Sequence, residues 1–96
     1  MLPDIERRIR IDFDSNLVHK VCTLLEDFNA QFETVYKDRP SPRIFRCLLR
    51  LSDGNMDDLI RYIKAALTDW RDVILWAEYD RDGNHVFSGN SRFKFK

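Results

Sequence analysis

The sequence has no excess charge of either sign and no long apolar run. Its 16 Lys and Arg residues balance 16 Asp and Glu residues, so the formal net charge is zero. Because nucleic-acid-binding proteins gather phosphates with a positive field, this balance argues against a nucleic-acid partner. The apolar runs, such as 73–77, are far shorter than the roughly 20 residues of a membrane span, and no signal segment opens the chain. We therefore expect a cytoplasmic protein without a membrane partner.

Cysteine and glycine are also scarce, with two and three residues respectively. Cys22 and Cys47 lack the close spacing of a disulfide or metal motif, and we interpret both as reduced thiols. The 96 residues are 44% hydrophobic and include seven Phe and two Trp. That is enough apolar material for one core, so we expect a single domain over 1–96.

Apolar residues recur at helical spacing over the first third of the chain. From Leu17 to Val35 they are three or four positions apart, and they follow the capping residues at 14–16, which predicts a helix over 15–36. The same period extends backward to Ile5. However, 8–14 also alternates polar and apolar residues, so a helix and a strand both stay open there.

Cap residues divide the middle of the chain into three more helices. Ser41 followed by Pro42 predicts a helix that runs to about residue 52 and stops at the glycine turn 53–54. Asn55 is a suitable cap for a helix over 56–68, and Asp69 for one that ends near residue 79. We therefore predict an all-α fold of about four helices in a compact bundle.

The alternative is an α+β fold. The stretch 73–79 is rich in residues that favour strands, and Asp82-Gly83 is a common hairpin turn before 85–87. The tail 88–96 alternates Phe with basic residues, so it is either a short strand that pairs with 8–14 or a loose terminus.

One segment of the chain shares its order of elements, which is helix, glycine turn, helix and then Asp-Trp-Arg-Asp, with other proteins. The segment from Arg46 to Tyr79, about a third of the chain, resembles small uncharacterised bacterial proteins with the same order of elements. The resemblance implies a bacterial origin and no particular activity.

The segment 80–88 is similar to the first nine positions of an EF-hand calcium loop. Asp80, Asp82 and Asn84 stand at its first, third and fifth positions, but His85 replaces the turn glycine and Ser91 replaces the closing Glu. We favour an ordinary polar turn and keep a calcium- or metal-binding domain as an alternative function.

No arrangement of residues typical of catalysis or of zinc binding occurs. His19, Cys22, Cys47 and His85 make a nominal set of zinc ligands, but their spacing is that of no zinc module. Nucleophilic triads, phosphate loops and metalloprotease motifs are missing from the sequence. We therefore predict a protein that is not an enzyme and has no cofactor and no metal.

Arginines form a basic face on the second predicted helix. The four residues are Arg39, Arg43, Arg46 and Arg50. Together with the helix that follows they have the outline of a helix-turn-helix, but Asp57 and Asp58 would point at the phosphate-lined groove. A nucleic-acid accessory protein is therefore an alternative function, and a solvated face paired with Glu26, Asp27 and Glu33 is the simpler interpretation.

The last predicted helix has two apolar faces. Leu75, Trp76 and Tyr79, with Asp72 beside them, lie opposite the inner stripe of that helix. Either the helix is buried on both sides or the outer face contacts a partner, and Trp and Tyr dominate such contacts. We therefore expect a non-enzymatic protein–protein interaction domain whose partner is another protein or a second copy in a homodimer.

Overall fold

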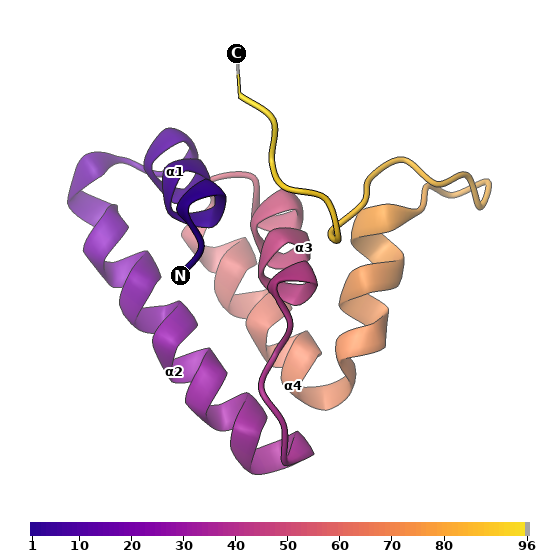
Figure 1. Cartoon of the computed structure of the whole chain (residues 1–96), viewed down its shortest axis with the longest axis horizontal. Coiled ribbons are helices and arrows are strands. Elements are labelled where there is room, and N and C mark those ends of the chain that lie inside the picture. The colour runs from indigo at the N-terminus through magenta and orange to yellow at the C-terminus, as the bar shows by residue number, and fades with distance from the viewer. Residues whose placement is uncertain (96) are drawn as a thin grey trace.

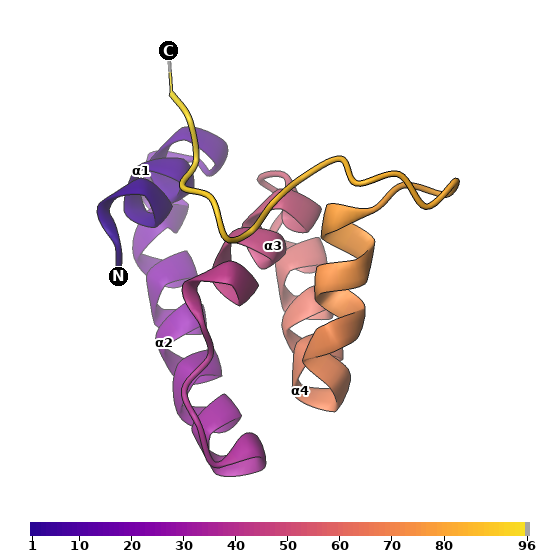
Figure 2. The same ribbon diagram turned by 45° about the vertical axis from the view of Figure 1, so that its right-hand side comes forward.

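The computed structural model describes residues 1–95. Its α-helices are α1 (Pro3–Asp12), α2 (Val18–Tyr36), α3 (Pro42–Ser52) and α4 (Met56–Glu78), with a short 3-10 turn, Ser15–Leu17, ahead of α2. In Figures 1 and 2, α3 lies between α2 and the second half of α4, and α1 crosses one end of the bundle. The all-α prediction is confirmed for these residues.

The segment before residue 13 is a helix. Proline occupies its first turn, where a missing N–H costs nothing, and Asp4 and Glu6 lie at its positive end. Ile5 and Ile9, one turn apart, are both buried. The strand alternative for 8–14 is therefore wrong, because burial follows helical spacing up to Asp12 and the chain becomes extended only at Phe13.

The two helices predicted over 56–79 are the two halves of α4. Asp69 has non-helical backbone angles (φ −156°, ψ 104°), and its carboxylate accepts the N–H of Arg71 at 3.1 Å. The chain reverses direction at this point, so the two halves run side by side (Figures 1 and 2). Asn55 caps the first half, as predicted, through the N–H of Asp58.

The α+β alternative is wrong for the described residues. Residues 73–78 are helical, and the turn at 82–83 reverses the chain between the two residues of a single antiparallel bridge, Tyr79 and His85, with no strand on either side of it. The tail forms no strand up to residue 95; residue 96 lies outside the described residues. The tail does lie beside the N-terminal segment, because Arg8 stacks over the ring of Phe93 at 5.0 Å.

All four helices contribute side chains to one core. Its largest fully buried members include Phe28, Leu25, Leu48, Leu49 and Leu59. Val35, which belongs to the predicted inner stripe, is 53% exposed, whereas its neighbour Tyr36 is half-buried and donates to the Ala66 carbonyl of α4 at 3.0 Å. Within residues 1–95, each helix is too short or too polar to form a membrane span.

Candidate interaction surface

The second half of α4 presents three large apolar side chains to solvent. Leu75 is 55% exposed, Trp76 49% and Tyr79 40%, whereas Val73 and Ala77 on the opposite side are buried. Buried and exposed side chains therefore lie on opposite faces of this half of the helix. We call Asp72, Leu75, Trp76 and Tyr79 the α4 stripe.

A hollow lies at the C-terminal end of the α4 stripe. Its volume is about 450 Å³, and it is lined by Leu75, Trp76, Tyr79, Asp80, Arg81 and Gly83. The Trp76 ring lies 6.2 Å from the ring of Tyr62, and the Tyr79 ring lies 5.2 Å from that of His85. The stripe therefore combines protruding apolar side chains with a concave surface, and neighbouring rings support two of its members.

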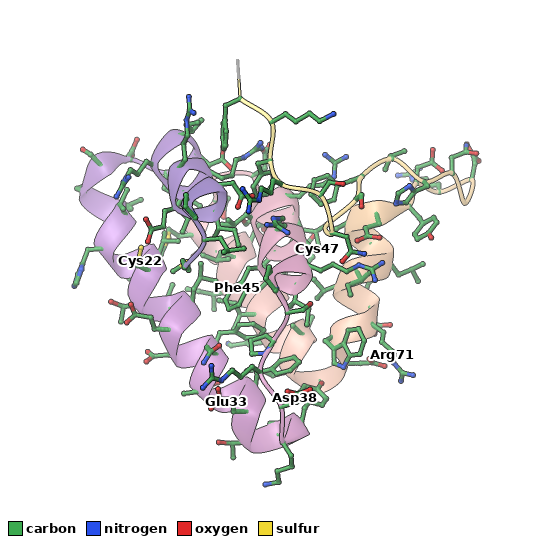
Figure 3. The ribbon with its side chains drawn as sticks, viewed as in Figure 1. Cys22, Glu33, Asp38, Phe45, Cys47 and Arg71 are labelled. Carbon is green, nitrogen blue, oxygen red and sulfur yellow. The ribbon has the colours of Figure 1, made fainter. Side chains whose placement is uncertain are left out.

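Charged groups flank the α4 stripe at both ends. Arg71 projects outward (Figure 3), and it is held by both carboxylate oxygens of Asp69 at 3.0 Å. Asp80 accepts the N–H groups of Asp82 and Asn84, each at 2.9 Å. By contrast, no ion pair involves Asp72 or Arg81 within residues 1–95.

The basic face proves to be engaged with groups of the protein itself. Arg46 is only 4% exposed, although the sequence places it on a solvated face. Its guanidinium donates to the Asp4 carboxylate at 3.0 Å and to the Gly89 carbonyl at 3.0 Å. The expectation of an exposed arginine there is wrong, because α1 and the tail cover this side of α3.

The other three arginines also have partners. Arg43 donates two hydrogen bonds to Glu78, at 2.8 and 2.7 Å. Arg50 donates to the Ala77 carbonyl at 3.1 Å and stacks over the ring of Phe87. Only Arg39 forms the predicted kind of pair with α2, to Glu33 at 3.2 Å and largely in solvent. Arg43 and Arg46 are thus held by carboxylates of the protein itself, whereas Arg39 and Arg50 stay exposed, so only part of this face remains for a phosphate.

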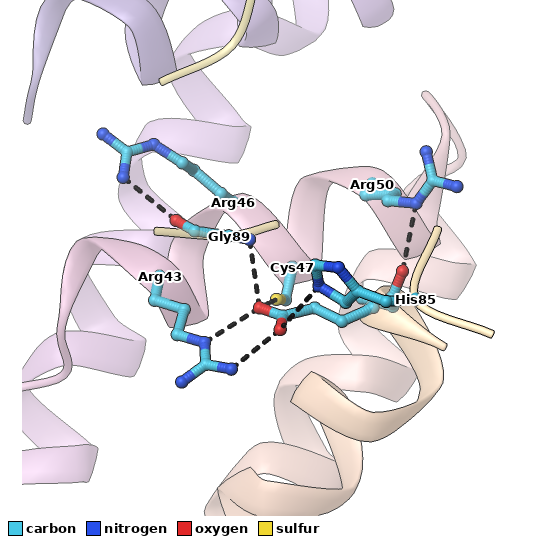
Figure 4. Close-up of polar contacts among 8 residues, drawn as sticks. Arg43, Arg46, Cys47, Arg50, His85 and Gly89 are labelled. Atoms are coloured by element: carbon cyan, nitrogen blue, oxygen red, sulfur yellow. Dashed lines mark hydrogen bonds and ion pairs between the residues drawn. The ribbon is translucent and has the colours of Figure 1, made fainter. Parts of the chain in front are cut away.

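Glu78 is the centre of a buried polar cluster (Figure 4). It is 2% exposed and accepts hydrogen bonds from Arg43, from the Gly89 N–H at 3.0 Å and from the Cys47 thiol at 3.7 Å. His85 lies 3.6 Å from the same carboxylate. The cluster thus joins α3, the end of α4 and the C-terminal tail.

The electrostatics of this cluster suit a structural role. The Arg43 guanidinium holds the pKa of Glu78 below its ordinary value, and Arg46 does the same for the pKa of Asp4. Burial raises the pKa of the Cys47 thiol to about 12, and the neighbouring carboxylate adds to the effect. A thiol in that environment is not a nucleophile at neutral pH.

No family model, curated protein or solved structure matches this chain. Its function must therefore be argued from its own geometry. The resemblance to small uncharacterised bacterial proteins stays an expectation.

The calcium-like segment forms a compact turn. The Asp80 carboxylate accepts hydrogen bonds from the backbone N–H groups of Asp82 and Asn84, so it already has hydrogen-bond donors within the turn. Within residues 1–95, no three His, Cys, Asp or Glu residues are placed to hold one metal ion. Cys22 lies on α2 and Cys47 on α3, well apart in Figure 3, and both are free.

Sequence reasoning missed Glu78 and Asp4. Glu78 follows the buried Ala77 by one position and lies at the edge of the inner stripe, and an acid at such an edge needs a buried partner. The excess of arginine over acid on 39–50 is the matching signal. The partners lie 35 and 42 residues from their arginines, so only the folded chain shows the pairing.

Proposed function

We propose that the protein is a small, non-enzymatic protein–protein interaction domain that forms a homodimer in the cytoplasm through the α4 stripe. The observation that carries the proposal is the half-exposed state of Leu75, Trp76 and Tyr79 on one helix face. Three adjacent large apolar side chains on a polar surface are typical of a contact site. Tyr and Trp contribute most to such contacts, because each buries a large rigid surface and keeps a polar atom.

Two further features favour self-association. The net charge is zero, so two copies do not repel one another at long range. Twofold dimers are also the commonest closed assemblies, and they need only one self-complementary patch on each subunit. The free state of both cysteines agrees with a reducing compartment.

Sedimentation velocity across the micromolar range tests the proposal. We expect the wild type to shift from monomer to dimer with concentration and the double variant Trp76→Ala with Tyr79→Ala to stay monomeric. The matched control is Ile11→Ala with Val35→Ala, which also removes two exposed apolar side chains but on α1 and α2. Circular dichroism confirms that each variant is folded.

The proposal fails if the wild type stays monomeric at every concentration. It also fails if the control variant dissociates as readily as the stripe variant, because the contact would then lie elsewhere. An unfolded stripe variant together with a monomeric wild type would show that this face merely completes the core.

A further inference from the structure

We infer that a hollow between α1, α3 and the C-terminal tail binds a small molecule that carries a phosphate group. Its volume is about 470 Å³, which lies within the usual range for small-ligand sites. We call it the basic hollow, after the cationic residues of α1, α3 and the tail that line it: Arg8, Arg50, Arg92 and Lys94. Among residues 1–95, no member of the α4 stripe lines this hollow, so the inference is independent of the proposed function.

The basic hollow is positively charged although the whole chain is neutral. No carboxylate of the described residues lines it. Three acids lie around it: Asp12 accepts from Arg8, Asp4 is bound to Arg46, and Asp53 lines an adjacent hollow. The four cations less Asp12 and Asp53 still leave two positive charges. A concave surface with such an excess attracts an anion.

Arg8 and Arg50 are fixed by contacts that leave their terminal nitrogens available. Each donates one hydrogen bond through Nε, Arg8 to the Asp12 carboxylate at 2.7 Å and Arg50 to the Ala77 carbonyl at 3.1 Å. Within residues 1–95, no Nη atom of either arginine donates to the protein. Figure 4 shows the terminal nitrogens of Arg50 pointing away from that carbonyl. A guanidinium fixed in this way binds an oxyanion with little further loss of side-chain entropy.

Two aromatic rings of the tail support these arginines and add apolar surface. The Arg8 guanidinium lies 5.0 Å from the centre of the Phe93 ring, and that of Arg50 lies 4.8 Å from the centre of Phe87. The two rings are 6.0 Å apart, and both line the basic hollow together with Val86. The hollow therefore offers apolar contact to the carbon part of a ligand beside the donors for its anionic part.

The donor set suits a phosphate better than a carboxylate or a nucleic-acid strand. A phosphate monoester has three terminal oxygens and nearly two negative charges at neutral pH, so it accepts from both arginines and from the hydroxyls of Ser88 and Ser91, which also line the hollow. A carboxylate offers only two oxygens in one plane. A nucleic-acid backbone needs cations along an extended groove, whereas these cations surround one recess.

Isothermal titration calorimetry of the full chain with phenyl phosphate tests the inference. We expect saturable one-to-one binding at or below millimolar concentration. Arg8→Gln and Arg50→Gln should each raise the dissociation constant roughly tenfold, because each removes charge-assisted hydrogen bonds to the phosphate. Inorganic phosphate should bind several-fold more weakly than phenyl phosphate, because it lacks a ring to contact the apolar side of the hollow.

A second pair of variants keeps the test independent of folding. Arg92 and Lys94 are exposed, and neither is in an ion pair among the described residues. Arg92→Gln with Lys94→Gln should therefore leave the circular dichroism spectrum unchanged and raise the dissociation constant roughly fivefold. The matched control is Arg10→Gln with Lys20→Gln, which removes the same two charges from exposed positions outside the hollow and should leave the dissociation constant unchanged.

Four results would overturn the inference. One is the absence of saturable phenyl phosphate binding at millimolar concentration in low salt. Another is an equal effect of the control pair and the tail pair, which would show attraction to total charge alone. Equal affinity for phthalate, which carries a ring and two carboxylates, would show that phosphate is not selected. Binding of a single-stranded oligonucleotide with a steep salt dependence, but not of phenyl phosphate, would assign the cations to a nucleic-acid backbone. A monomeric wild type would overturn the proposed function and leave this inference standing.

Discussion

The substitution Glu78→Gln should destabilise the protein strongly although it changes few atoms. The carboxylate is 2% exposed and accepts two hydrogen bonds from Arg43, one from the Gly89 N–H and one from the Cys47 thiol. Glutamine has nearly the same shape but no charge, and its amide nitrogen cannot accept. One arginine donor is therefore left without an acceptor in the interior.

The magnitude follows from the burial of the two partners. Removing one member of a buried ion pair costs about 3–5 kcal/mol. The Arg43 side chain is 33% exposed, so solvent offsets part of the loss, and glutamine keeps one acceptor. We expect a loss of about 2–3 kcal/mol in the free energy of unfolding, which corresponds to roughly 10–20 °C in melting temperature for a domain of this size.

Urea and thermal unfolding, followed by circular dichroism, measure this loss. The matched control is Glu33→Gln, which removes the same charge from an exposed pair with Arg39, and we expect its cost to be under about 1 kcal/mol. Equal effects of the two substitutions would refute the reasoning, because they would show that burial of Glu78 does not decide its contribution.

The pH dependence of stability provides a second measurement on the same group. The pKa values of Glu78 and Asp4 are both lowered by an arginine partner. Folding therefore favours the ionised forms of both carboxyl groups. Their contribution to the free energy of unfolding is complete above the ordinary carboxyl pKa range of about 4. It is lost as the pH falls through that range toward the lowered values. Stability should decline below about pH 5, and the decline should be shallower in Glu78→Gln.

Three further predictions concern the tail, the thiols and the turn. Gly89→Ala should cost about 1–3 kcal/mol in unfolding free energy, because an added Cβ would lie 2.8 Å from the Arg43 carbonyl oxygen and 2.9 Å from the Cys47 sulfur; a melting temperature equal to the wild type would contradict this contact. In the native state a thiol reagent should modify Cys22 well before Cys47, as mass spectrometry of the digested protein would show, and equal rates would place Cys47 in solvent. Millimolar calcium should leave the melting temperature unchanged; a rise that disappears in Asp80→Ala would show a calcium site.

Local signals were sufficient for most helix boundaries. The Ser41-Pro42 start of α3, its end before Gly54 and the Asn55 cap all depend on the conformational preferences of a few adjacent residues. The helix boundary at Asp69 was predicted for the same reason, but the reversal of chain direction there was not. Residue type and spacing also indicated which residues of α4 face outward, since a helix presents its faces with a fixed period.

Segments with two local preferences needed the folded chain. Residues 8–14 and 73–79 each suit a helix or a strand by sequence, and short apolar runs do not distinguish the two. Burial of Ile5 and Ile9 against the core favours the helical spacing in the first segment. In the second, Val73, Ile74 and Ala77 are buried while Leu75 and Trp76 are exposed, and this spacing is helical.

What the sequence alone determined is the class of the fold, most helix ends and the apolar outer face of α4. These features follow from interactions between residues a few positions apart, so they do not depend on how the helices pack together. The partners of the arginines were decided only by the tertiary structure. Arg43 and Arg46 meet Glu78 and Asp4 across 35 and 42 residues, and such contacts depend on how whole helices and the tail pack. The spacing of the arginines identifies one side of α3 in the sequence. Only the packing shows that α1 and the tail cover this side, because the acids that pair with the arginines are distant in the chain.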